Sequence, residues 1–138
     1  GFSNYLISQA YGFEIYPTNI TGSIGGYENL DNFQTGIHDY FKYLKYGFGR
    51  ATDIVNNHIR RNRITREQGV KIVSMHDGSY PKEYLGKKLS EILNEINVSL
   101  EEFDEICNQF TNKEIFKVNN AGELIKDTNK KLISKITY

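Results

Sequence analysis

The sequence has little of what a disulfide-bonded, metal-binding or membrane-spanning protein requires. Its 138 residues include one cysteine, two prolines and no tryptophan. Cys107 has no second cysteine with which to form an internal disulfide, and no cluster of cysteines and histidines has the spacing of a metal site. No run approaches the ~18 apolar residues that a membrane helix needs, and the N-terminal stretch shows no secretion signal. We therefore expect no metal ion, no membrane insertion and a cytoplasmic location.

The chain also lacks an excess of charge of either sign. Its 17 Lys and Arg residues balance 17 Asp and Glu residues, which argues against general binding to nucleic acid. The charges are nevertheless segregated along the chain. Residues 50–71 hold five arginines and one lysine against two acidic residues, whereas residues 89–105 hold six acidic residues and no basic one. The length fits a single domain, and the segregation leaves docking to a partner open as a function.

Aromatic rings and cations concentrate between His38 and Asp53, in the sequence HDYFKYLKYGFGRATD. Apolar residues before and within this stretch recur at steps of three and four, which predicts a helix that ends at the break Gly47-Phe48-Gly49. A second helix with the same spacing begins after the glycines. The free backbone amides at its start, with Lys45 and Arg50 close by, predict a site for a phosphate or carboxylate.

Other local signals predict further helices. In a capping box, a Ser or Thr and a Glu or Gln three residues later bind the first free backbone amides of a helix. The sequence has this pattern at Thr65 and at Ser99, and each predicts the start of a helix. Between them, Pro81 opens an amphipathic stripe that continues to Asn97. Residues 115–125 are typical of two short strands around an Asn/Gly turn. We expect a mainly α-helical chain of about five helices with a small C-terminal β-hairpin.

Several motifs together resemble a known family. They comprise YENLDN at 27–32, GIHDY at 36–40, KYGFGRATD at 45–53, and Arg60 with Thr65-Arg66-Glu67. This combination resembles the C-terminal third of N-acetyl-sugar amidotransferases, which are PP-loop enzymes of lipopolysaccharide O-antigen and flagellin-sugar biosynthesis. The resemblance implies a parent enzyme that converts the acetamido group of a nucleotide-activated sugar into an acetamidino group. It also implies ATP and Mg as cofactors, and ammonia from a separate glutaminase subunit.

The resemblance further implies that this chain is the C-terminal helical portion of a larger α/β enzyme. The SGGxDS loop, with which PP-loop enzymes hold the pyrophosphate of ATP, does not occur here. We therefore expect residues 1–17 to be the tail of an upstream nucleotide-binding domain and residues 18–26 to be a loop or linker. Residues 27–112 would then be the helical domain, and residues 113–138 a short β element with the C-terminal tail. The fragment alone is not expected to be active.

The charged residues of the central stretch are candidate binding residues. Lys42, Lys45, Arg50 and Asp53 occupy positions of the family pattern and are expected to contact substrate or phosphate, because arginine offers a bidentate fork and lysine a point charge. The alternative is that the lysines extend along an aromatic helix and make cation–π contacts with its tyrosines. For Asp53 the further alternatives are to hold Arg50, to position a sugar hydroxyl or a magnesium ion, or to stabilise the helix dipole.

His38, Asp39 and the arginines that follow are further candidates. His38 and Asp39 are residue types suited to proton transfer, but neighbours on a helix point about 100° apart, so we do not expect them to pair with each other. Arg60, Arg63 and Arg66 form a candidate face for an anion or a protein partner, or else a solvated helix end. Two other functions remain open, namely a helical interaction module without a catalytic role and the lid of a different PP-loop ligase.

Overall fold

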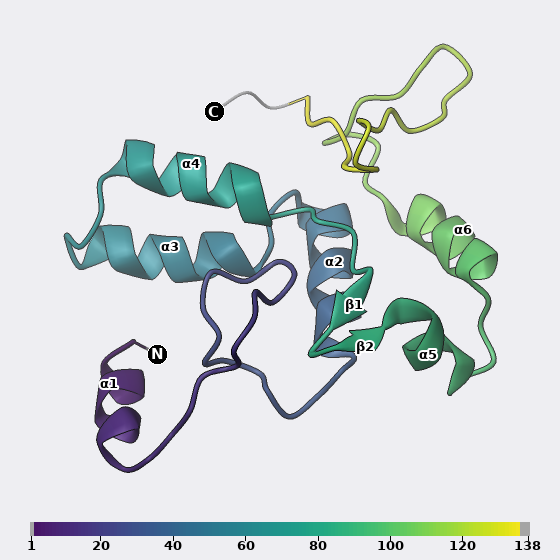
Figure 1. Cartoon of the computed structure of the whole chain (residues 1–138). Coiled ribbons are helices and arrows are strands. Elements are labelled where there is room, and N and C mark those ends of the chain that lie inside the picture. Colours follow the sequence, from purple (N-terminus) through teal and green to yellow (C-terminus); the bar gives the residue numbers. More distant parts are fainter. Residues whose placement is uncertain (1, 136–138) are drawn as a thin grey trace.

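The chain folds as six α-helices and one two-stranded hairpin in the computed structural model, which describes residues 2–135 (Figure 1). The helices are α1 (Phe2–Ala10), α2 (Thr35–Tyr46), α3 (Arg50–Arg60), α4 (Arg66–His76), α5 (Leu89–Asn94) and α6 (Leu100–Phe110). The strands β1 (Glu83–Tyr84) and β2 (Lys87–Lys88) pair antiparallel. The mainly helical class predicted from the sequence is confirmed.

The glycine break between α2 and α3 lies where the sequence predicts it. Gly47 ends α2 with a φ of 78°, a left-handed conformation that glycine adopts without a steric penalty, and its N–H donates to the Tyr43 carbonyl. The predicted capping boxes are also confirmed, because Thr65 starts α4 and Ser99 starts α6 in this way. Each of these signals acts within a few residues of chain, which is why the sequence shows it.

Helices α3 and α4 run side by side as a closely packed pair (Figure 1). Gly69 makes this approach possible, because a Cβ at this position would lie 2.7 Å from Ile59 Cδ1 and 2.8 Å from Val55 Cγ1. The pair therefore depends on a residue without a side chain in the middle of α4.

The single long helix predicted for residues 81–97 is wrong in its first half. Helix α5 begins only at Leu89, and the chain before it turns back as the β1–β2 hairpin. Leu85 and Gly86 form the turn with φ values of 50° and 77°. Tyr84 then enters a core cluster with only 2% of its surface exposed. Burial of this ring outweighs the local helical pattern, because a large aromatic side chain gains most from leaving water.

Two apolar clusters form the core. The larger joins α2, α5, α6 and the C-terminal segment through Tyr40, Tyr43, Leu44, Leu89, Leu93, Phe103, Cys107, Phe116 and Leu132. The smaller consists of Ile20, Tyr84 and Ile92. Ile20 is 5% exposed and Ser23 is 6% exposed. The segment 18–26, expected as a loop or linker, is thus a loop that is packed into the fold.

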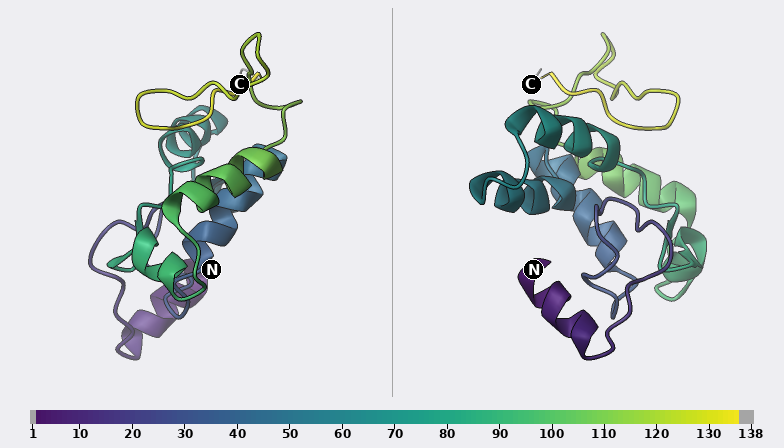
Figure 2. Two further views of the ribbon diagram at one scale, coloured as in Figure 1. Left: turned by 90° about the vertical axis from the view of Figure 1, so that its right-hand side faces the viewer. Right: turned by 60° about the vertical axis from the view of Figure 1, so that its left-hand side comes forward.

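The C-terminal segment lies across one end of the molecule (Figure 2). Isolated antiparallel bridges join Phe116 to Ser134, Val118 to Leu124 and Lys126 to Leu132. The C-terminal hairpin expected from the sequence is therefore reduced to single bridges, and the regular hairpin of the chain is β1–β2. The segment is anchored by Phe116, whose side chain is fully buried.

Helix α1 stands apart from the other helices (Figure 2). A ring stack joins it to the 27–28 segment, with the ring centroids of Tyr5 and Tyr27 4.6 Å apart. Leu6 and Ile7 are more than half exposed. Within residues 2–135, no helix is long and apolar enough to cross a membrane.

Candidate functional site

A polar hollow beside α3 gathers several of the charged residues predicted from the sequence. We call it the α3 hollow; its volume is about 180 Å³, and it is lined by Tyr27, Glu28, Arg50, Asp53, Ile54, Asn57, His58, Arg61 and Arg63. One wall is the segment at 27–28, and the other is a face of α3 with the turn that follows it. Of the candidate residues from the sequence, Arg50, Asp53 and Arg63 lie in this lining.

The α3 wall of the hollow follows from helical spacing. Asp53, Asn57 and Arg61 are separated by four residues each, and residues at this spacing lie on one face of a helix. From the sequence, Asp53 was a candidate site residue, whereas Asn57 and His58 had no predicted role. The four-residue spacing from Asp53 was the signal that would have identified Asn57 and Arg61.

Tyr27 forms the opposite wall, and the ring of Tyr5 packs against its ring. Tyr5 stacks on it with an interplanar angle of 16°. Burial raises the pKa of Tyr27, Glu28 and Tyr5 raise it further, and the charge of Arg63 acts in the opposite direction. The phenol therefore stays protonated at neutral pH, so the hollow presents an aromatic ring and a hydroxyl donor next to an arginine.

Arg50 is engaged by the protein itself. Its Nε donates to Asp39 Oδ2 at 2.5 Å, and its Nη2 donates to Asp39 Oδ1 at 2.9 Å. When the Asn29 amide is oriented with its oxygen toward the guanidinium, that oxygen accepts from Nη2 at 2.8 Å. Glu28 lies 4.0 Å from Nη1. Arg50 thus ties the 28–29 segment to α2 and positions one wall of the hollow.

The electrostatics of this pairing favour a permanently charged arginine. Burial by itself lowers the pKa of Arg50, but the hydrogen bonds and the negative charge of Asp39 outweigh burial and raise that pKa above its ordinary value. Asp39 is 8% exposed, so the pair is removed from most of the solvent. Holding Arg50 was one of the alternative roles expected for Asp53, whereas the structure assigns this contact to Asp39.

His38 and Asp39 also lie together, which corrects the expectation that they would not. His38 Nδ1 is 3.2 Å from Asp39 Oδ1, although the residues are neighbours on α2. The Cα–Cβ bonds of neighbouring helix residues do point apart, but rotation about the side-chain torsions allows an imidazole to reach the adjacent carboxylate. The His38 side chain is 77% exposed, so this contact lies at the surface.

Lys42 and Lys45 take different directions from α2. Lys42 forms an ion pair with Asp53, and its ammonium lies 4.8 Å from the centroid of the Phe48 ring. Lys45 lies 4.9 Å from the centroid of the Phe110 ring on α6. The cation–π alternative is therefore realised, with these two phenylalanines in place of the helix tyrosines. Lys45 is not part of the α3 hollow.

The amides at the start of α3, which the sequence offered as an anion site, already have an anionic partner. Asp77 is 4% exposed and accepts from the Gly49 N–H at 2.8 Å, from the Ala51 N–H at 3.0 Å and from the Thr52 hydroxyl at 2.6 Å. Gly49 permits this approach, because a Cβ there would lie 2.7 Å from Asp77 Oδ1. An internal carboxylate therefore occupies the place that was expected for a phosphate.

The arginine face expected from Arg60, Arg63 and Arg66 is divided by the fold. Arg63 lines the α3 hollow, Arg66 lines a separate groove on the other side of α3, and Arg60 lines neither. Within the part of the chain that the structure describes, no three His, Cys, Asp or Glu side chains gather as they would around a metal ion.

Comparisons with known proteins assign the chain to a family. Residues 10–132 match the model of the C-terminal domain of LPS biosynthesis proteins that are WbpG-like. No curated protein matches the sequence. The matched span includes α2 to α6, both apolar clusters and every lining residue of the α3 hollow. The chain belongs to the family of WbpG-like LPS biosynthesis proteins, and residues 10–132 form its C-terminal domain.

Proposed function

We propose that this domain is the C-terminal part of an ATP-dependent amidotransferase, which converts the acetamido group of a nucleotide-activated sugar into an acetamidino group. The family supports this at the level of LPS biosynthesis. The observation that carries the proposal is the α3 hollow, in which three arginines, two carboxylates, an amide and an aromatic ring converge. In this proposal the hollow contacts the nucleotide-linked sugar.

The chemistry of the hollow suits a ligand that carries both phosphate and hydroxyl groups. Arg61 makes no ion pair with any carboxylate among residues 2–135, so its planar fork can bind a phosphate bidentately. Asp53 and Asn57, one turn apart on the same wall, can accept from and donate to sugar hydroxyls. The ring of Tyr27 offers an apolar face on which a sugar or a base can pack.

The size of the hollow limits what this domain contacts. Sites for whole small molecules commonly measure about 300–1,000 Å³, whereas the α3 hollow measures about 180 Å³. The hollow therefore holds one portion of a nucleotide sugar, and the remainder of the ligand extends to the part of the parent protein that precedes this domain. This division agrees with the proposal that catalysis requires both parts.

In this proposal ATP and Mg are held outside the described residues of this domain. The backbone amides at the start of α3 are occupied by Asp77, and residues 2–135 contain no carboxylate or histidine cluster for a metal ion. We therefore assign to this domain only contact with the sugar substrate. The isolated chain is expected to hydrolyse no ATP, and turnover by the purified chain in a phosphate-release assay would contradict this assignment.

The proposal is tested by calorimetric titration of the full-length parent with UDP-N-acetylglucosamine, a representative nucleotide-linked N-acetyl sugar. We expect Arg61→Gln to weaken binding roughly 10- to 100-fold, the loss of one charge-assisted contact of about 1.5–3 kcal/mol. Arg60→Gln is the matched control, because Arg60 is also exposed and lies outside the hollow. Circular dichroism checks that both variants fold. Equal binding by the two variants would refute the role of the α3 hollow.

A further inference from the structure

A second and larger hollow lies between α3, α4 and the C-terminal segment, and we call it the α3–α4 groove. Its volume is about 430 Å³, within the usual range for sites of small molecules. It shares no lining residue with the α3 hollow, because Thr52, Val55, Asn56 and Ile59 point to the other side of α3. The groove is therefore independent of the proposed sugar contact.

The floor of the groove is apolar. It is formed where α3 meets α4, by side chains that include Val55, Val70 and Val73, and Leu132 of the C-terminal segment forms a wall. Val70 is 37% exposed, so part of this apolar surface faces solvent. A ligand with an apolar body would remove this surface from water, which is the main favourable contribution to binding in such sites.

The charged groups of the groove leave a positive balance. Lys131 and Arg66 are its cations, and Asp77 is its carboxylate. The Asp77 oxygens already accept three hydrogen bonds at the start of α3. The carboxylate is thus committed to the fold, whereas the cations are available to a ligand.

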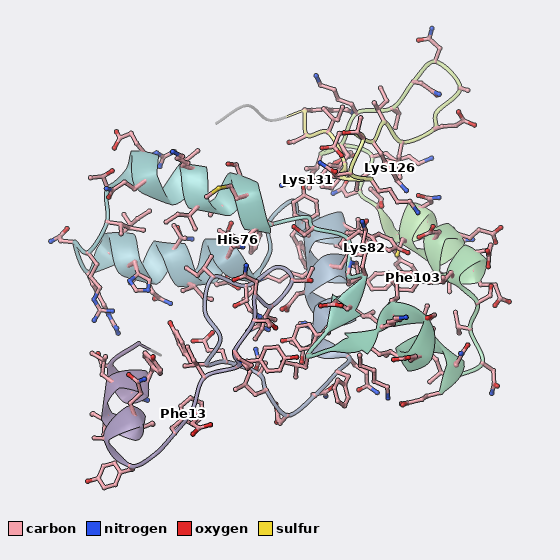
Figure 3. All side chains as sticks on the ribbon, viewed as in Figure 1. Phe13, His76, Lys82, Phe103, Lys126 and Lys131 are labelled. Atoms are coloured by element: carbon pink, nitrogen blue, oxygen red, sulfur yellow. The ribbon has the colours of Figure 1, made fainter. Side chains whose placement is uncertain are left out.

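Lys131 is the cation best placed to bind an anion. Its Nζ donates to the Ser74 carbonyl at 2.7 Å, so the ammonium lies at the C-terminal end of α4 (Figure 3). Lys131 makes no ion pair with a carboxylate among the described residues. Burial lowers the pKa of its ammonium, and the negative charges of Asp77 and Asp127 raise that pKa by a smaller amount. An ammonium has three donors, and one is used here. A partly buried cation of this kind gains from an anionic partner.

We propose that the α3–α4 groove binds a small organic anion, whose apolar body lies on the valines of α3 and α4 and whose acidic group pairs with Lys131. Arg66 lies eight residues before Ser74 on α4, about 12 Å along the helix, so it borders the far end of the groove. The body of the ligand is therefore expected to be as long as two fused aromatic rings or a chain of medium length.

The test uses 2-naphthoate as the probe and 2-naphthamide as its neutral counterpart, each titrated into the isotope-labelled chain by NMR. We expect saturable binding of 2-naphthoate with shifts confined to the lining of the groove, which comprises residues of α3 and α4, Tyr43, Gly47, Asp77 and residues 131–134. We expect much weaker binding of the amide. Lys131→Gln is expected to weaken binding roughly tenfold. Lys135→Gln is the matched control, because Lys135 also donates to a backbone carbonyl from the same segment and lies outside the groove.

A second variant tests the apolar part of the groove without removing a charge. Val70→Trp is expected to abolish binding by filling the groove, whereas Met75→Trp, at an exposed position of α4 outside the lining, leaves binding unchanged. Equal affinity for the acid and the amide, or equal effects of the two lysine variants, would overturn the proposal. Two results would assign the groove to a protein partner instead. One is a dimer of the chain in sedimentation experiments that prevents binding of the probe, and the other is failure of the probe to bind in the full-length parent.

Discussion

Removal of the Asp77 carboxylate is the most direct test of how the central part of this domain is held together. Its oxygens bind the amides of Gly49 and Ala51 and the hydroxyl of Thr52, which come 25 to 28 residues earlier in the chain. It thus caps α3 from a distance and fixes the end of α4 against the start of α3. Asp77→Ala leaves two buried N–H groups without their partner.

The expected loss follows from these contacts. Loss of a helix cap costs about 0.5–2 kcal/mol, and each buried donor left unsatisfied costs about 1–3 kcal/mol. Water that enters the vacated space recovers part of this cost. We expect Asp77→Ala to lower the free energy of unfolding by about 3 kcal/mol, out of the roughly 5–15 kcal/mol typical of a domain. The variant therefore still folds and can be measured.

The assay is unfolding in guanidinium chloride at neutral pH, followed by circular dichroism, with thermal unfolding in parallel. A loss of about 3 kcal/mol corresponds to a decrease in melting temperature of roughly 6–12 °C for a chain of this size. Asp31→Asn is the control, because Asp31 is exposed and makes no described hydrogen bond. A change for Asp77→Ala no larger than that of the control would refute the capping role.

Three further outcomes are expected. Gly69→Ala should destabilise the chain by about 1–3 kcal/mol in urea unfolding, because the added Cβ would collide with the buried Val55 side chain. This cost is expected to exceed the gain from the better helix propensity of alanine. A gain in stability would show that α3 and α4 separate easily. Arg50→Gln should cost about 3–5 kcal/mol, since it leaves the Asp39 carboxylate buried without its cation, and Asp39→Asn in the same background should recover part of the loss in the same unfolding assay. Burial raises the pKa of the Cys107 thiol to about 12, so iodoacetamide at pH 8 should label it only after unfolding, because the native thiol stays protonated; rapid labelling of the native chain would contradict its burial.

Features that depend on neighbouring residues could be predicted from the sequence. The capping boxes at Thr65 and Ser99 and the end of α2 at the glycine break were predicted from the sequence and are found in the structure. In each case the interacting groups lie within four residues of one another, so the identity of the side chain nearly determines the conformation. The mainly helical class follows from the same local signals.

The candidate site was only partly visible in the sequence. The stretch from His38 to Asp53 drew attention to Arg50 and Asp53, and both line the α3 hollow. The sequence did not reveal that Tyr27 and Arg61 line the same hollow, because the two residues are far apart along the chain. The spacing along α3 indicates the wall of the hollow that this helix forms. The opposite wall is the 27–28 segment, which only the tertiary contacts of Arg50 bring to this place.

The sequence by itself determined where α2 ends and where α3, α4 and α6 begin, that charge is segregated along the chain, and which residue types are available for binding. Only the tertiary structure decided which charges meet: Asp39 and not Asp53 holds Arg50, and Asp77 and not a ligand caps α3. It also decided that Tyr84 enters the core through a hairpin where the local pattern favoured a helix. The physical reason is that a carboxylate can pair with any of several cations or amides in the chain, and an aromatic ring can pack against many apolar residues. The sequence does not distinguish among these partners, and only the packing of distant segments brings one of them within reach.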